Sequence, residues 1–198
     1  MSVDKISSSR LVKISKYLSK HLRHAPEQLG LQLAPGGWVQ VDELLMACAG
    51  LASPQGNRAQ FPISRAELEA VVSRNDKQRF AFDTTRERIR ANQGHSIAVD
   101  LQLEPVAPPA VLYHGTGHRA VDSILRQGLR KMSRHHVHLS KDMETARKVG
   151  SRHGRPVIFA VDTAAMSASG FTFYCSNNGV WLVEQVPSDY LTKLETNN

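Results

Sequence analysis

Cysteine is scarce in this sequence, and long apolar segments are absent. The two cysteines, Cys48 and Cys175, lie far apart and belong to no CxxC pair, which argues against a disulfide framework and for free thiols in a reducing compartment. No apolar run approaches the roughly 18 residues of a membrane span, and residues 1–5 lack the apolar region of a signal peptide. We therefore expect neither a leader nor a membrane span, and a cytoplasmic location.

Two nucleotide-binding motifs are also missing. The chain has no GxGxxG and no GxxxxGK[ST], so Rossmann and P-loop folds have no support. Acidic residues are absent from two histidine-bearing strings, 113–116 and 135–140, and a third polar string follows at 178–182. A site built from His, Arg, Ser and Thr suits an anionic ligand better than it suits a hydrolase that works through paired carboxylates.

The charge balance is basic. The chain has 198 residues, 41% of them hydrophobic and 22% charged, which is ordinary for one large or two small globular domains. A net charge of +7 and a pI of about 9.7 favour a polyanionic partner such as nucleic acid. Charge alone leaves open the alternative of a merely basic surface.

The first half of the chain predicts helices followed by a hairpin. Leu11, Ile14, Leu18 and Leu22 form one apolar stripe on a helix over 9–24. The other predicted elements are a hairpin of 31–33 with 38–41, a short helix at 42–49, a loop over 50–62, a helix from a Ser64/Glu67 capping box to about Arg74, and a hairpin of 79–82 with 88–91. This order, with a charged hairpin tip, resembles a winged helix.

The second half predicts alternating strands and helices after a stiff, proline-containing linker at 100–110. The predicted elements are a strand at 111–114, a helix over 118–127 closed by Gly128, a strand at 137–139, a helix over 144–152 closed by Gly154, a strand at 156–161 and a mostly β tail to about Val186. The fold class predicted for the whole chain is α+β.

Basic residues mark two candidate anion sites in the first half. Arg23 and His24 end the first helix, where a guanidinium fork suits phosphate; the alternative is a solvated cationic helix end. A second basic stretch could contact nucleic-acid backbones, the alternative being ordinary surface charge, and consists of Arg74, Lys77, Arg79, Arg86, Arg88 and Arg90. The polar loop Gln93-Gly94-His95-Ser96 follows it.

The second half carries histidines at strand ends. His114-Gly115-Thr116 lies at a strand-to-helix turn, where glycine permits close backbone approach to a ligand. His136 and His138 share one face of a strand and could bind zinc, but no further ligand stands at a suitable spacing, so we expect no metal. Arg134 is a further anion-binding candidate, and Cys175 is expected to be a bystander thiol.

These strings, in this order, resemble the RNA 2′-phosphotransferase family over nearly the whole chain. The resemblance rests on Leu18-Ser19-Lys20-His21-Leu22-Arg23-His24, Gly37-Trp38-Val39, Asn75-Asp76-Lys77-Gln78-Arg79-Phe80, Ile89-Arg90-Ala91-Asn92-Gln93-Gly94-His95-Ser96, Tyr113-His114-Gly115-Thr116, His136-Val137-His138-Leu139-Ser140 and Gly179-Val180-Trp181-Leu182. It implies an N-terminal winged-helix RNA lobe over 1–99, the linker 100–110, and a C-terminal ADP-ribosyltransferase-like lobe with a split β-sheet over 111–198.

The resemblance also implies a function. The family removes a 2′-phosphate from RNA with NAD as co-substrate and without metal, in two steps through an ADP-ribosylated RNA phosphate. The roles implied are phosphate binding and catalysis for Arg23, His24, Lys77, Arg79 and Arg134; NAD binding for His114, Gly115, Thr116, His138, Ser140 and Val180; and RNA binding for Arg23, His24, Arg79, Gln93, His95 and Ser96. The partner implied is a tRNA-like RNA with a 2′-phosphate, bound by a monomer.

Two other functions stay open at this point. The chain could be an ADP-ribosyltransferase that modifies terminal phosphates of nucleic acids, or a winged-helix nucleic-acid binder without catalysis. His114 and His138 argue against the second, and Lys77, Arg79 and Arg134 favour the phosphotransferase over the first.

Overall fold

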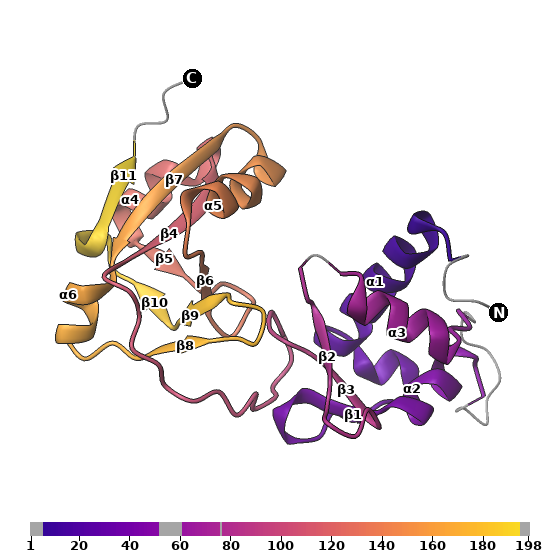
Figure 1. Ribbon diagram of the computed structural model, residues 1–198. Helices are drawn as coiled ribbons and strands as arrows, with labels where there is room; N and C mark the ends of the chain where they lie inside the picture. Colours follow the sequence, from indigo (N-terminus) through magenta and orange to yellow (C-terminus); the bar gives the residue numbers. More distant parts are fainter. Residues whose placement is uncertain (1–5, 52–60, 76, 195–198) are drawn as a thin grey trace. The chain divides into compact units, whose positions relative to one another are not determined.

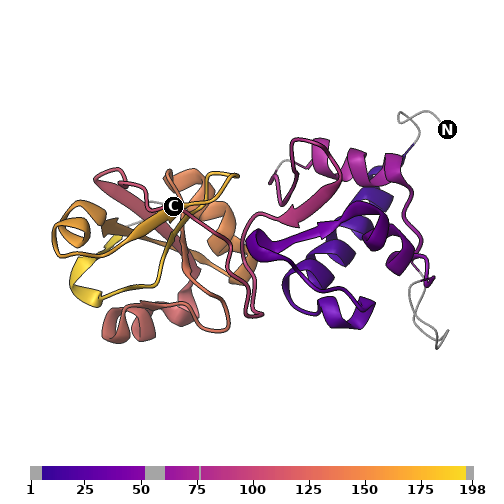
Figure 2. The same cartoon turned by 90° about the horizontal axis from the view of Figure 1, so that it is seen from below.

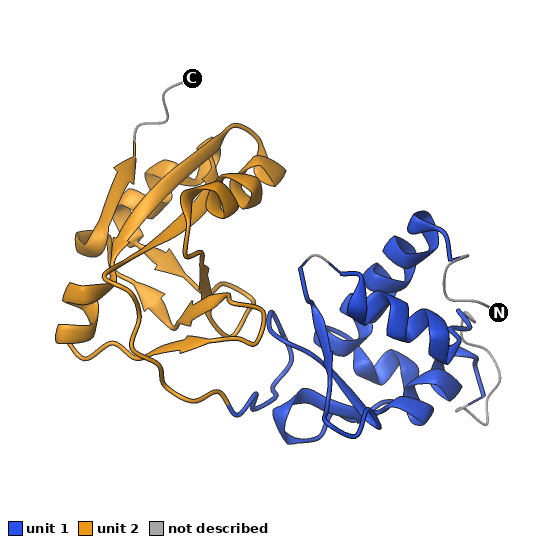
Figure 3. Ribbon diagram, viewed as in Figure 1, with its two compact units in different colours: residues 1–102 blue, residues 103–198 orange. Residues whose placement is uncertain are grey.

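The computed structural model describes residues 6–51, 61–75 and 77–194 (Figure 1). The chain divides into two compact units, unit 1 over residues 1–102 and unit 2 over residues 103–198 (Figure 3). Both units combine helices with small antiparallel sheets, so the predicted α+β class is confirmed. No helix among the described residues is both long and apolar enough to span a bilayer.

The described residues of unit 1 form three α-helices, and all three were predicted. They are α1 (Ser8–Arg23), α2 (Val41–Cys48) and α3 (Arg65–Ser73), with 3-10 turns η2 (Pro26–Leu29) and η3 (Pro35–Gly37) between the first two. The predicted apolar stripe of α1 supplies Ile14, Leu18 and Leu22, which are fully buried. The capping box at the start of α3 is also present, because Ser64 accepts from the Glu67 amide and Glu67 accepts from the Ser64 amide.

The sheet of unit 1 differs in part from the prediction. Strands β1 (Trp38–Gln40), β2 (Phe80–Phe82) and β3 (Arg88–Ala91) form an antiparallel sheet in the order β1-β3-β2. The predicted hairpin of 79–82 with 88–91 is confirmed, whereas the hairpin of 31–33 with 38–41 is wrong.

The turn before β1 explains that error. Gly36 and Gly37 have φ values of 83° and 75° and form a 3-10 turn, so the chain between Leu33 and Trp38 makes only an isolated bridge from Ala34 to Trp38. Strand β1 therefore pairs with the distant β3. The predicted loop over 50–62 lies largely outside the described residues.

The described residues of unit 2 include two three-stranded antiparallel sheets, whose strands are labelled in Figure 1; Figure 2 shows the same unit from below. One has the order β11-β7-β4 and consists of β4 (Val111–Gly117), β7 (Pro156–Asp162) and β11 (Leu191–Leu194). The other has the order β6-β9-β8 and consists of β6 (Val137–Leu139), β8 (Phe173–Cys175) and β9 (Trp181–Val183). Tyr113 and Ser140 exchange two backbone hydrogen bonds, which link the two sheets. A short pair, β5 (Leu129–Arg130) with β10 (Gln185–Val186), completes the strands described.

The helices of unit 2 agree with the prediction with one exception. They are α4 (Val121–Gln127), preceded by η4 (His118–Ala120); α5 (Met143–Gly150), followed by η5 (Ser151–His153); α6 (Thr163–Ala168); and η6 (Ser188–Tyr190). The two predicted helices are α4 and α5. The tail predicted as mostly β also contains α6, which Asp162 caps by accepting from the Ala165 amide.

The proline-containing segment before β4 is held to unit 2. The Val106 amide donates to the Phe173 carbonyl at 2.9 Å, and Pro105 forms an isolated bridge with Tyr174. Pro105 and Val106 of the segment 100–110 thus lie beside β8.

Candidate functional site

In unit 1, the end of α1 meets the loop that follows β3. The Ser96 amide donates to the Arg23 carbonyl at 3.0 Å, and the Ser96 hydroxyl lies 2.8 Å from Nδ1 of His24. The carbonyl at the end of α1 is satisfied from outside the helix, as buried helix ends require. Arg23 and His24 from one predicted string and Ser96 from another are therefore together.

The Arg23 guanidinium reaches the turn that carries Arg79. Its Nη2 donates to the Arg79 carbonyl at 3.3 Å, and its Cζ lies 5.9 Å from the centre of the Phe80 ring. The Asn92 amide donates to the same Arg79 carbonyl at 2.9 Å. The two donors to this carbonyl fix the backbone at Arg79. The guanidinium group of Arg23 is thereby held beside the residue that carries the guanidinium group of Arg79.

Asn75 and Asn92 hold this turn, and sequence reasoning gave neither of them a role. Asn92 is buried, and its Nδ2 donates at 2.6 Å to the carbonyl of Gln78, whose φ is 40°. Asn75 Oδ1 accepts from the Lys77 amide at 3.0 Å and from Arg79 Nη1 at 3.4 Å. Both asparagines stand within the quoted motif strings, but only the folded chain shows which backbone groups they bind.

The remaining predicted residues of unit 1 differ in exposure. Lys77 is exposed and Gln93 half-buried, whereas His95 is 1% exposed and lies beneath Gly37. The His95 side chain is thus part of the interior that supports this loop, and direct contact with a ligand would need the loop to move.

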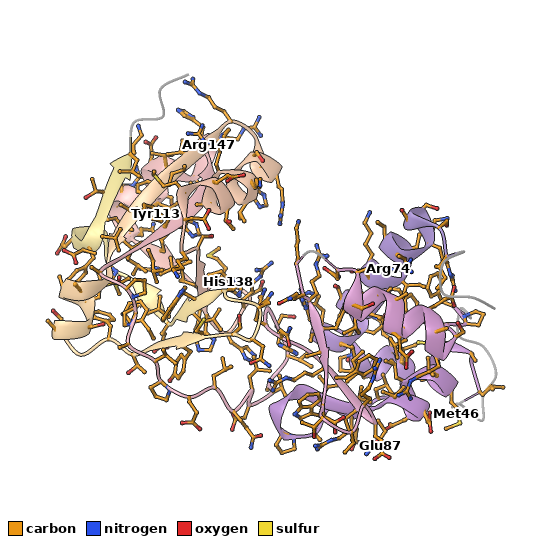
Figure 4. The ribbon with its side chains drawn as sticks, viewed as in Figure 1. Met46, Arg74, Glu87, Tyr113, His138 and Arg147 are labelled. Carbon is orange, nitrogen blue, oxygen red and sulfur yellow. The ribbon has the colours of Figure 1, made fainter. Side chains whose placement is uncertain are left out.

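In unit 2, His114 on β4 and His138 on β6 are joined by a hydrogen bond (Figure 4 labels His138). Nδ1 of His114 lies 3.1 Å from the His138 carbonyl, which can only accept, so the His114 proton is on Nδ1. Burial lowers the pKa of His114, and the bond to the His138 carbonyl opposes this in part. The His114 ring is therefore neutral near pH 7 and keeps Nε2 as an acceptor.

Arg134 is linked to the same pair. Its Nη1 lies 3.0 Å from Nδ1 of His138, and because arginine has only donors, Nδ1 of His138 accepts. The neutral His138 ring then carries its proton on Nε2. The predicted anion-binding arginine and the two predicted NAD-binding histidines thus form one chain of contacts.

Gly115 has a packing role that the sequence did not reveal. A Cβ at this position would lie 1.7 Å from the carbonyl oxygen of Ala146 on α5. The missing side chain therefore lets α5 pack against β4. Thr116, next to it, is buried, and its backbone faces Gly150 at the end of the same helix.

Ser140 and Val180 lie at a common end of sheet β6-β9-β8. Leu139 pairs with Trp181, and each of the two residues stands one position beyond that pair. Val180 is held by Ser176, whose hydroxyl lies 3.2 Å from the Val180 amide and whose own amide donates to the Val180 carbonyl at 2.9 Å. Val180 offers no acid at this place.

The described residues contain no cluster of three or more metal-ligating side chains. His136 lies 5.5 Å, ring centre to ring centre, from Tyr174, and both line a cavity of about 440 Å³ together with Lys131, His135 and Glu184. Burial raises the pKa of the Cys175 thiol, as expected for an unreactive cysteine.

Unit 1 thus presents guanidinium groups on a hydrogen-bonded turn, and unit 2 presents a guanidinium beside two neutral imidazoles. Guanidinium forks suit phosphate oxygens. Neutral imidazoles suit hydroxyl and amide groups, so these residues together favour a phosphorylated substrate and a polar nucleotide.

Comparison with known proteins agrees with this chemistry. Residues 9–185 match the family described as RNA 2′-phosphotransferase, Tpt1 / KptA family. A protein of Nostoc punctiforme named "Probable RNA 2′-phosphotransferase" is 65% identical over 189 residues, covering 96% of this chain and all of that protein. Proteins with the same name from Trichormus variabilis and Streptomyces griseus are 68% and 54% identical, covering 94% and 92% of this chain and 98% and 96% of their own lengths.

Proposed function

The chain belongs to the RNA 2′-phosphotransferase family, and we propose that it removes an internal 2′-phosphate from RNA with NAD as its second substrate. The observation that carries the NAD part is the contact chain Arg134–His138–His114. It sets a phosphate-binding fork next to two neutral imidazoles, one with an acceptor nitrogen and one with a donor.

The residues of unit 2 fit NAD by their donor set. Nε2 of His114 can accept from a ribose hydroxyl, and Nε2–H of His138 can donate to an oxygen of the ligand. Backbone groups at Gly115 and Thr116, with Ser140 and Val180, would complete the pocket. When bound, NAD supplies an electrophilic ribose carbon and nicotinamide as a leaving group.

The proposed reaction has two steps. First, an oxygen of the RNA 2′-phosphate bonds to ribose C1″ as the bond to nicotinamide breaks, which leaves an ADP-ribosylated RNA phosphate. Second, the ribose 2″-hydroxyl bonds to phosphorus, and the RNA departs with a free 2′-OH, leaving ADP-ribose 1″,2″-cyclic phosphate. The first step needs orientation more than a base, because the phosphate is already an anionic nucleophile.

Cationic side chains would act mainly in the second step. Arg23, His24, Lys77, Arg79 and Arg134 are the groups we propose to hold the 2′-phosphate. Negative charge grows on the phosphate oxygens when phosphorus is attacked, and preorganised donors stabilise such charge most effectively. The backbone bonds at Arg79 supply this preorganisation for Arg23 and Arg79. Gln93 and Ser96 would complete the RNA-binding loop, with the buried His95 supporting it.

Unit 1 is proposed to act as a winged-helix RNA lobe, since its helices precede the antiparallel hairpin β2–β3 with its charged tip. Unit 2 is proposed to be an ADP-ribosyltransferase-like lobe, since its two small sheets meet at Tyr113 and Ser140. We further propose that the protein acts as a monomer on tRNA-like RNA and without metal.

The test is a product analysis. The full chain is incubated with NAD and an RNA that carries one internal 2′-phosphate, and the RNA and nucleotide products are resolved. We expect 2′-OH RNA, nicotinamide and ADP-ribose 1″,2″-cyclic phosphate, formed only with NAD. ADP-ribosylated RNA as the final product would favour a terminal-phosphate ADP-ribosyltransferase instead, and 2′-OH RNA formed without NAD would refute the proposed co-substrate.

A further inference from the structure

One end of unit 2 carries a cluster of arginine and histidine side chains outside the residues assigned above. It lies where β4 ends, η4 begins, α5 and η5 end, and β7 begins. Its members, called the β4–β7 basic surface from here on, are His118, Arg119, Arg147, Arg152, His153 and Arg155 (Arg147 is labelled in Figure 4). All six side chains are exposed.

Backbone contacts hold the three segments of this surface together. Gly117 at the end of β4 pairs with Pro156 at the start of β7, and the His118 amide donates to the Arg155 carbonyl at 2.9 Å. A Cβ on Gly117 would lie 2.2 Å from the His153 carbonyl oxygen, so η5 is packed directly on the end of β4. The six side chains therefore project from a fixed scaffold.

Their charge is not offset locally. Among the described residues, none of the four arginines forms an ion pair, and the nearby Glu144 is taken by Lys148 at 2.6 Å. The four guanidinium groups carry four positive charges on one surface, more than half of the net charge of +7 of the whole chain. Such a concentration of one sign attracts a polyanion at long range.

The surface is separated from the histidine site of the same unit. Gly115 and Thr116 are the only residues of β4 between His114, which contacts His138, and Gly117. A strand rises about 3.4 Å per residue, so these three steps from His114 to Gly117 span roughly 10 Å along β4. Successive phosphates of an RNA chain that passes the His114–His138 contact could therefore reach these arginines.

We infer that the β4–β7 basic surface binds backbone phosphates of the RNA that flank the reacting nucleotide. This inference rests on the proposed function for the identity of the polyanion. Guanidinium groups match phosphate oxygens, and such contacts set affinity without reading sequence. Arg152 and Arg155 should thus raise affinity for long RNA and leave the chemical steps unchanged.

The test compares R152Q/R155Q with the matched double variant R126Q/R130Q, which removes two exposed arginines from α4 and β5 of the same unit. Binding of a fluorescent single-stranded RNA is measured across a salt series. Each lost phosphate contact reduces the magnitude of the slope of log affinity against log salt concentration by about 0.7. For R152Q/R155Q we therefore expect a slope smaller in magnitude by roughly 1.4, and roughly tenfold weaker RNA binding. The control should bind as wild type does.

Turnover separates this inference from the proposed function. With a long 2′-phosphorylated RNA, R152Q/R155Q should show a raised RNA KM at unchanged kcat, whereas a short RNA that ends close to the phosphate should give wild-type values.

A wild-type slope and RNA KM in the variant would overturn the inference while leaving the reaction intact. A raised KM for NAD alone would overturn it too, since the surface would then serve NAD. Loss of RNA affinity in a chain that shows no turnover would support the surface and refute the reaction. Thermal unfolding of both variants checks that they fold.

Discussion

The two units of the molecule position their candidate functional groups in different ways. In unit 1, the turn that carries Arg79 has no regular secondary structure and is held by hydrogen bonds. Arg23 and the backbone amide of Asn92 donate to the Arg79 carbonyl, and the Asn92 side chain donates to the Gln78 carbonyl. In unit 2, His114 and His138 are fixed by strands, and α5 packs against β4 at Gly115. Hydrogen bonds thus act in both units, but only in unit 2 does the position of the site also depend on close packing of a helix against a strand.

The largest effect should follow from breaking the steric fit of unit 2. In Gly115→Ala the new Cβ would overlap the Ala146 carbonyl, and overpacking of this kind costs about 3 kcal/mol or more of unfolding free energy. Each unit holds one of the two tryptophans, so Trp181 fluorescence in a Trp38→Phe background reports on unit 2. We expect unit 2 to unfold at much lower denaturant concentration.

A matched control is Gly170→Ala in the same unit. Gly170 has a φ of 88° and open space around the Cβ position, so this substitution brings only backbone strain of roughly 1–2 kcal/mol. Equal unfolding midpoints for the two variants would show that α5 does not press on β4.

The next largest effect should be a difference between the rates of the two chemical steps. Replacing Lys77, Arg79 or Arg134 with alanine should slow the second step about a hundredfold and the first step less, because charge builds on the phosphate oxygens in the second. Single-turnover assays on labelled RNA should then show ADP-ribosylated RNA accumulating. His138→Ala should instead fail before nicotinamide is released. Parallel loss of both steps in all three cation variants would assign these cations to docking alone.

Arg23→Lys tests whether the geometry of the fork matters more than its charge. Lysine keeps the charge but cannot donate to the Arg79 carbonyl and to a phosphate in the same plane. A lost contact of this kind costs about 1–3 kcal/mol, so kcat/KM should fall roughly ten- to hundredfold. Activity within twofold of wild type at subsaturating RNA would remove Arg23 from the site.

Asn92 tests the hydrogen-bonded turn of unit 1. Asn92→Ala removes the donor to the Gln78 carbonyl and should lower kcat/KM about tenfold by releasing Arg79. A double-mutant cycle with Arg79→Ala distinguishes this role from general stability, because two residues that act through one another give non-additive effects. Additive losses in the cycle would mean that Asn92 supports only the fold.

The sequence predicted most of the elements because their signals are local. The stripe of α1, the capping box of α3 and the β2–β3 hairpin each lie within one short window. The pairing of β1 with β3 joins residues 50 positions apart, and α6 has six residues, too few for a helical period to show. Motif strings led to Arg23 and His138 as candidates, but the bonds of Asn92 and the contact at Gly115 depend on tertiary structure.

The smallest effect concerns pH and again separates the units. Burial lowers the pKa of His114 and His136 in unit 2, and of His21 in unit 1, from the usual 6.5. A histidine with a lowered pKa binds protons more readily when unfolded, so its stabilising contribution is complete above pH 6.5 and declines as the pH falls below it. Between pH 7.5 and 5.5, unit 2 should therefore lose more stability than unit 1.

The lowered pKa values of Glu67, Asp83 and Asp142 act only at lower pH, where carboxylates titrate. Denaturant unfolding of Trp38→Phe and Trp181→Phe variants at both pH values gives the measurement. His136→Gln should reduce the decline seen through Trp181, and an unchanged decline would assign the pH dependence of unit 2 to other groups.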